Sequence, residues 1–153
     1  MPRTSAGLLL FRRSPDVEVL LGHMGGPFWA RKDDGAWSIP KGEYGDGEDP
    51  FAVARREFEE ELGSPVPASQ FISLGAVKAA SGKVLTVWAA EGAFDVATAV
   101  SNTFELEWPP RSGRVQTFPE IDRAAWFGLD EARRKVVKGQ VPHLDRLAER
   151  LGT

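Results

Sequence analysis

The segment RREFEEELGS, residues 55–64, carries four glutamates, and Glu57, Glu60 and Glu61 among them are spaced three or four residues apart. On a helix these three would share about one quadrant, where each like-charge pair costs roughly 0.2–0.5 kcal/mol. They also fall near the helix end, where the helix dipole disfavours anions. A solvated acidic face is the ordinary interpretation of a charge run. Because spacing and position both oppose stability here, we favour a site for a hard divalent cation, Mg²⁺ or Mn²⁺.

The helix that carries these glutamates is predicted to span Pro50 to Leu62. Asp49 is a suitable N-cap, proline suits the first helical position, and Gly63 is a suitable stop. Helical spacing brings three apolar side chains to the core-facing side: Phe51, Phe58 and Leu62. Glu59 points away from the other glutamates and is expected to be solvated.

The rest of the chain mixes strand-like and helix-like segments. Strands are predicted at residues 6–13, 17–22, 36–39, 71–79, 83–91 and 124–127, and helices at 129–138 and 142–151. A turn is expected at Ser14–Asp16. Residues 41–48 contain too much glycine for regular structure, and residues 101–119 suggest a loop interrupting strand-like pieces. The pattern predicts a mixed β-sheet with helices on its faces, in the α/β (α+β) class.

Length and composition restrict the function. The 153 residues suit one domain, and 42% hydrophobic with 27% charged residues is typical of a globular protein. The net charge of −3 gives no basic footprint for nucleic acid, and no apolar run approaches the ~20 residues of a membrane span. The absence of cysteine excludes disulfides, thiolate metal sites and cysteine nucleophiles. We therefore expect a cytoplasmic protein with neither nucleic acid nor membrane as a partner.

Residues 42–64 resemble the Nudix box, Gly-x5-Glu-x7-Arg-Glu-U-x-Glu-Glu-x-Gly-U, where U is a bulky apolar residue. All seven fixed positions are present, from Gly42 and Glu48 to Gly63. Two softer positions depart from the pattern, because Phe58 is aromatic and Ser64 is not apolar. The resemblance implies a single Nudix hydrolase domain over residues 1–153, folded as an α/β/α sandwich with a mixed central sheet.

The resemblance also assigns roles to individual residues. The metal ligands would be the carboxylates of Glu57, Glu60 and Glu61, helped by the carbonyl of Gly42. Glu48 would hold a further metal ion or its water. The general base for the attacking water would be Glu57 or Glu120, and the sequence does not choose between them. Arg56 would orient the glutamates rather than contact substrate.

Substrate contacts are expected just before the box and in the loop at residues 23–35. Lys41 would contact a phosphate as a point charge. Phe28 and Trp29, an aromatic pair in a glycine-rich loop, are the best candidates to stack on a base. His23 and His143 lack ligand-spaced neighbours and are expected to be ordinary loop or helix-start residues.

The function that the resemblance implies is cleavage of a nucleoside diphosphate linked to another group. Ser5-Ala6-Gly7 and the stretch WSIPKG at residues 37–42 resemble the branch that acts on nucleoside triphosphates and dinucleoside polyphosphates. ADP-ribose or nucleotide-sugar pyrophosphatase activity is the alternative within enzymes. A catalytically silent, nucleotide-binding Nudix-like module is the alternative from another class. The expected assembly is a monomer or homodimer.

Overall fold

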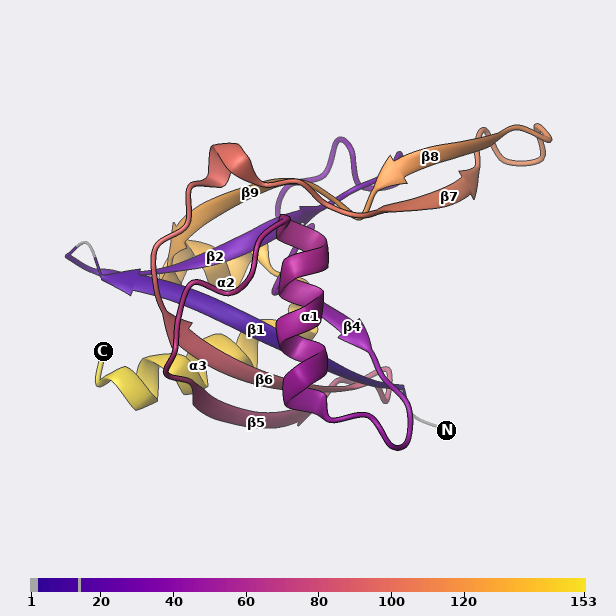
Figure 1. Cartoon of the computed structure of the whole chain (residues 1–153). Helices are drawn as coiled ribbons and strands as arrows, with labels where there is room; N and C mark the ends of the chain where they lie inside the picture. The colour runs from indigo at the N-terminus through magenta and orange to yellow at the C-terminus, as the bar shows by residue number, and fades with distance from the viewer. Residues whose placement is uncertain (1–2, 14) are drawn as a thin grey trace.

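The computed structural model describes residues 3–13 and 15–153, and it shows a mixed sheet between two layers of helices (Figure 1). Within these residues the strands are β1 (Thr4–Arg13), β2 (Val17–Met24), β3 (Trp37–Ser38), β4 (Lys41–Glu43), β5 (Ile72–Lys78), β6 (Val84–Glu91), β7 (Thr103–Glu107), β8 (Val115–Pro119) and β9 (Ile121–Gly128). The α-helices are α1 (Pro50–Leu62), α2 (Leu129–Lys135) and α3 (Val141–Leu151), and the 3₁₀ helices are η1 (Val96–Thr98) and η2 (Lys138–Gln140). Ser14 of the predicted turn lies outside the described residues.

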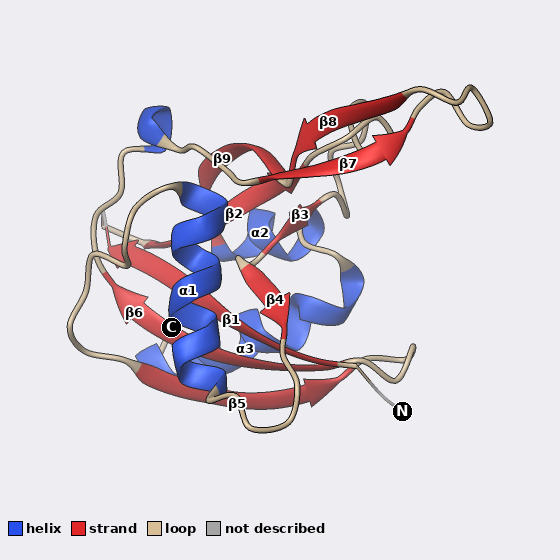
Figure 2. Ribbon diagram, turned by 45° about the vertical axis from the view of Figure 1, so that its right-hand side comes forward, coloured by secondary structure: helices blue, strands red, loops and turns tan. Residues whose placement is uncertain are grey.

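The main sheet has the order β3-β2-β1-β6-β5, with β9 paired to β2 and β4 paired to β1. β1 and β6 run parallel, whereas the other pairs in the sheet are antiparallel. Successive β1 side chains point to opposite faces, so Leu8 and Leu10 pack toward α1 while Leu9 and Phe11 pack toward α2 and α3. Figure 2 shows α1 on one face and α2 and α3 on the other. The predicted α/β/α sandwich with a mixed sheet is confirmed.

The first part of the glycine-rich stretch is a strand, so the expectation of irregular structure for residues 41–48 is wrong at residues 41–43. β4 pairs with β1, with Gly42 opposite Ala6. The strands approach closely because Gly7 has no side chain: a Cβ there would lie 2.8 Å from the Pro40 carbonyl oxygen. That oxygen accepts a hydrogen bond from the Leu8 N–H at 3.0 Å. The pairing places Gly42, the first residue of the Nudix box, beside β1 in the main sheet.

The helix predicted at residues 129–138 ends three residues early, at Lys135. Val136 is buried, and the next residue's N–H donates to the Trp37 carbonyl oxygen at 2.9 Å. The chain therefore leaves the helix to pair with β3, and a 3₁₀ turn at residues 138–140 leads into α3. This turn brings Gln140 over β3.

Residues 101–119 have the predicted pattern of strand-like pieces interrupted by a loop. β7 and β8 form an antiparallel hairpin in register from Thr103↔Pro119 to Glu107↔Val115. The hairpin projects from the body of the molecule (Figure 1). The segment between the two strands, residues 108–114, is the loop expected from its prolines and glycine.

Candidate active site

The acidic helix has the predicted limits because both of its ends are capped. The Asp49 side chain accepts a hydrogen bond from the Phe51 N–H at 3.3 Å. Gly63 ends the helix with φ 88°, and a Cβ there would lie 2.7 Å from the Val100 carbonyl oxygen. The core-facing side was predicted correctly for Phe58 and Leu62, which are fully buried, and Glu59 is exposed as expected. The caps therefore fix the limits of α1 and the side of the helix from which each glutamate projects.

Two of the box glutamates lie against β4. The carboxyl group of Glu57 packs on Gly42 so closely that a Cβ at this glycine would lie 2.2 Å from the Glu57 Cδ atom. Glu61 is only 8% exposed, and its Oε2 atom accepts a hydrogen bond from the Lys41 N–H at 3.3 Å. Because Gly42 has no side chain, it leaves the space that the Glu57 carboxyl group occupies.

Arg56 lies among three glutamates. Its guanidinium nitrogens are 3.4 Å from Glu48 Oε2, 3.7 Å from Glu57 Oε2 and 3.8 Å from Glu60 Oε1. Glu48 is also held by the Gly45 N–H at 2.9 Å, and this bond lowers its pKa below the ordinary value. The guanidinium therefore offsets part of the repulsion that the sequence predicts.

The remaining repulsion appears in the pKa values. Burial raises the pKa of Glu61 to about 8, and the charges of Glu57 and Glu120 act in the same direction against the favourable charge of Lys41. Burial, followed by the charge of Glu60, also raises the pKa of Glu57. Carboxylates that are costly to ionise and hydrogen-bonded to few donors suit a bound cation, which would stabilise their charged forms.

The side chains are not already arranged around a metal ion. Among the described residues no group of three or more histidine, aspartate or glutamate side chains is placed to hold one. Instead the guanidinium of Arg56 contacts Glu48, Glu57 and Glu60. Binding a cation would therefore require these side chains to turn from the guanidinium toward the metal.

Glu120 is brought to this helix by a distant segment of the chain. The Asn102 N–H donates to the Glu60 carbonyl oxygen at 2.8 Å, and the Glu120 N–H donates to the Asn102 carbonyl oxygen at 2.9 Å. Glu120 is close enough to raise the pKa of both Glu57 and Glu61. Both candidate bases thus belong to one acidic cluster.

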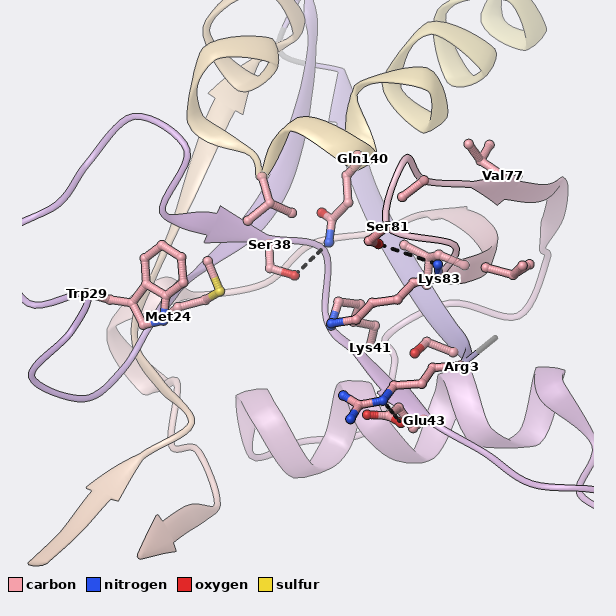
Figure 3. A pocket seen from close by; sticks show the side chains of 16 residues that line it. Arg3, Met24, Trp29, Ser38, Lys41, Glu43, Val77, Ser81, Lys83 and Gln140 are labelled. Atoms are coloured by element: carbon pink, nitrogen blue, oxygen red, sulfur yellow. Dashed lines mark hydrogen bonds and ion pairs between the residues drawn. The ribbon is translucent and has the colours of Figure 1, made fainter. Parts of the chain in front are cut away.

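A cavity of about 360 Å³ adjoins this cluster at β4 (Figure 3). Lys41 and Glu43 line the cavity, whereas Gly42 between them contacts Glu57. The other lining side chains include Arg3, Met24, Trp29, Ser38, Ser81, Lys83 and Gln140. The box glutamates themselves are not among the lining residues, so the cavity and the acidic cluster lie on the two sides of a three-residue strand.

Three polar residues of the cavity were not anticipated from the sequence. Arg3 and Lys83 add positive charge beside Lys41. Gln140 accepts a hydrogen bond from the Ile39 N–H at 2.8 Å and donates to the Ser38 hydroxyl at 2.9 Å. Because these contacts join positions about a hundred residues apart, no local pattern could have indicated Gln140.

The structure separates the two aromatic candidates. Trp29 lines the cavity and packs partly against the core. Phe28 is 62% exposed and is not among the lining residues; Lys32 Nζ lies 3.6 Å from its ring centroid. Trp29 is thus the better placed of the pair to stack on a base.

The prediction for the histidines is correct in part. His143 lies in the first turn of α3, as expected for a helix-start residue, although it is fully buried. His23 is a fully buried residue of β2, so its assignment to a loop is wrong. The strand predicted at residues 17–22 is present, but β2 continues two residues further, to Met24.

Stability without metal should fall as the pH rises from about 5 to about 8. The folded protein keeps a proton on Glu61 up to its raised pKa of about 8, whereas the unfolded chain releases it near 4.5, so ionisation opposes folding in this window. Chemical denaturation with a chelator present measures this slope, and Glu61→Gln should flatten it. A pH slope that is the same in wild type and Glu61→Gln would contradict the assignment.

The comparisons identify the family. The model of the NUDIX domain matches residues 1–147, so the chain belongs to the NUDIX family. By this membership it is a Nudix-type hydrolase, a class that uses divalent metal ions. The expected recognition and enzyme class are confirmed.

Solved structures share the fold. C. elegans Ap4A hydrolase in a binary complex is 21% identical, with a TM-score of 0.65 over 97% of this chain and 98% of that one. The NUDIX domain of Shewanella oneidensis NrtR, complexed with ADP ribose, is 16% identical, with a TM-score of 0.66 over 99% and 89%. The M. smegmatis Nudix hydrolase RenU is 23% identical, with a TM-score of 0.61 over 97% and 85%.

No curated protein sequence matches the chain significantly. In the part of the chain that the structure describes, no helix combines the length and the apolar character needed to cross a membrane.

Proposed function

We propose that the protein is a Mg²⁺-dependent pyrophosphohydrolase whose substrates are nucleoside triphosphates or dinucleoside polyphosphates. The observation that carries this proposal is the contact of Glu57 with Gly42, directly beside a cavity that Trp29 and Lys41 line. This contact brings the cluster of carboxylates next to the cavity that would hold the nucleotide. Mn²⁺ is the second choice of ion, since it shares the preference for oxygen ligands.

The metal would be held by the carboxylates of Glu48, Glu57, Glu60 and Glu61 and the carbonyl of Gly42. When bound, it supplies Lewis acidity, lowers the pKa of a bound water and neutralises negative charge on the phosphates. Arg56 contacts Glu48, Glu57 and Glu60, which suits a residue that orients these side chains.

The attacking water must lose a proton to a carboxylate. Glu57 and Glu120 remain the two candidates for this general base. Glu57 packs on Gly42, in the strand that separates the acidic cluster from the cavity, so its carboxylate lies beside the proposed substrate site. Glu120 is exposed and close to the same cluster, so it has room to reach a water there.

The cavity suits the nucleoside end of the substrate. Its volume of about 360 Å³ is in the range of small-molecule sites, roughly 300–1,000 Å³. Trp29 offers a ring for the base, with Phe28 beside it in edge contact at 4.9 Å between ring centroids. Lys41 and Lys83 provide positive charge for the phosphates, whereas Arg3 is paired with Glu43 at 3.9 Å, and Lys41 stands where the cavity meets the box.

ADP-ribose or a nucleotide sugar is the second candidate substrate. The similarity to the ADP-ribose-bound domain of NrtR makes this class worth testing, because the two chains share the fold over nearly their whole length. A silent nucleotide-binding module is disfavoured, since all box carboxylates are present. One domain over residues 1–153, a cytoplasmic location and a monomeric or homodimeric state stay predictions.

The proposal is tested by a substrate panel with Mg²⁺ and identified products. Nucleoside triphosphates, diadenosine polyphosphates, ADP-ribose and sugar nucleotides should be offered at equal concentration. We expect cleavage at a phosphoanhydride bond, fastest with one of the first two classes and lost with a chelator. Preference for ADP-ribose or sugar nucleotides would replace the leading substrate by the second, and no cleavage of any compound would overturn the proposal.

A further inference from the structure

We infer that His23, with Asp122, is a positioning residue that clamps the aromatic loop at residues 25–35 onto the substrate cavity. The inference rests on the proposed function, because that loop carries Trp29. His23 touches neither the cavity nor the acidic cluster, so it would act through the loop.

His23 is held on both sides of its ring. Its side chain has no exposed area, and Nδ1 lies 2.9 Å from Asp122 Oδ1 while Nε2 lies 2.7 Å from the Lys32 carbonyl oxygen. The ring of Trp37 packs against it edge-on, with 5.1 Å between centroids. The imidazole therefore links β9 directly to the far part of the aromatic loop.

Both polar contacts require the ring to donate. A backbone carbonyl oxygen and a carboxylate can only accept, so a proton on each ring nitrogen satisfies the pair. The Nδ1 contact is then a hydrogen bond donated to the Asp122 carboxylate. Charge-assisted hydrogen bonds of this kind are about twice as strong as neutral ones, which suits a clamp.

An irregularity in β9 aims Asp122 at the histidine. β2 and β9 pair His23 with Arg123 and Met24 with Ile121, so Asp122 is an extra residue where the register shifts. Bulges of this kind re-aim side chains and are common beside active sites. The segment just before Asp122 also holds the loop, because the Gly25 N–H donates to the Glu120 carbonyl oxygen at 2.8 Å.

Lys32, in the part of the loop that His23 holds, also contacts the Phe28 and Trp29 rings. Lys32, whose carbonyl oxygen His23 binds, places its Nζ atom 3.6 Å from the Phe28 ring centroid and 5.3 Å from the Trp29 ring centroid. Release of Lys32 would free this contact and the loop around it. The consequence should be weaker substrate binding rather than slower chemistry.

The experiment compares KM and kcat for His23→Phe, Asp122→Ala and Asp122→Asn. The first two should raise KM about tenfold or more while kcat changes less, because each removes a part-buried hydrogen bond of the clamp altogether. Asp122→Asn should stay close to wild type, since its amide can donate to Nδ1 of a neutral ring while Nε2–H still binds Lys32. His143→Gln, at the other fully buried histidine, is the matched control and should leave KM unchanged.

Hydrogen exchange of residues 25–35 provides a readout that needs no substrate. His23→Phe and Asp122→Ala should increase exchange there, and His143→Gln should not. The clamp is wrong if KM and loop exchange stay at wild-type values, or if Asp122→Asn behaves like Asp122→Ala. If the wild-type protein cleaves no nucleotide, the proposed function fails while exchange still decides the clamp. If His23→Phe does not fold, Asp122→Ala decides it, because Asp122 lies near the surface, with 29% of its side chain exposed.

Discussion

Gly42→Ala should reduce kcat/KM by about 100-fold or more without unfolding the protein. The new Cβ would lie 2.2 Å from Glu57 Cδ and 2.3 Å from its Oε1, so the carboxyl group must move. Displacement of a catalytic group by about 1 Å costs on the order of 100-fold in rate. Alanine fits the extended backbone of β4, and the strand pairing with β1 does not involve this side chain.

Gly45→Ala is the matched control, because a Cβ at Gly45 meets no atom within 4 Å and its backbone is not in the left-handed region. It should keep nearly full activity. Steady-state kinetics and thermal unfolding of both variants separate a local displacement from a general loss of structure. Equal activity in the two variants would show that the Glu57–Gly42 contact is irrelevant to turnover.

Glu60→Gln should lower metal-dependent turnover by at least about 100-fold, the upper end of the loss seen when a ligand's hydrogen-bond partner is removed. The substitution keeps the shape of the side chain and removes the charge that a divalent cation needs. It also removes one like charge beside Glu57, and its ion pair with Arg56 at 3.8 Å is half exposed and weak. The melting temperature without metal should therefore hold or rise, and a clear drop would contradict the repulsion argument.

The parts of this account that were predictable from sequence depend on local spacing. The limits of α1 follow from Asp49, Pro50 and Gly63, and the convergence of Glu57, Glu60 and Glu61 follows from helical periodicity. Ser64 departs from the apolar position at the end of the box pattern. Val66, two residues later, supplies an apolar side chain that packs against the buried residues of α1 and the sheet. Local spacing alone thus predicts the acidic cluster on α1.

What was missed depends on contacts between distant segments. β4 looked irregular because its glycine has low strand propensity, yet pairing with β1 makes it a strand. Gln140 reaches the cavity only because α2 ends early and the chain pairs with Trp37. His23 had no nearby ligand-spaced partner, since Asp122 is 99 positions away along the chain.

The most direct test of the central claim is the Mg²⁺ dependence of hydrolysis for wild type, Glu60→Gln and Glu59→Gln on the preferred nucleotide. Glu59 is the matched control, because it lies next to Glu60 on α1 but faces solvent away from Gly42. The account predicts saturable activation by Mg²⁺ in wild type and Glu59→Gln and almost none in Glu60→Gln. Equal Mg²⁺ activation in all three proteins would show that the box glutamates do not hold the metal.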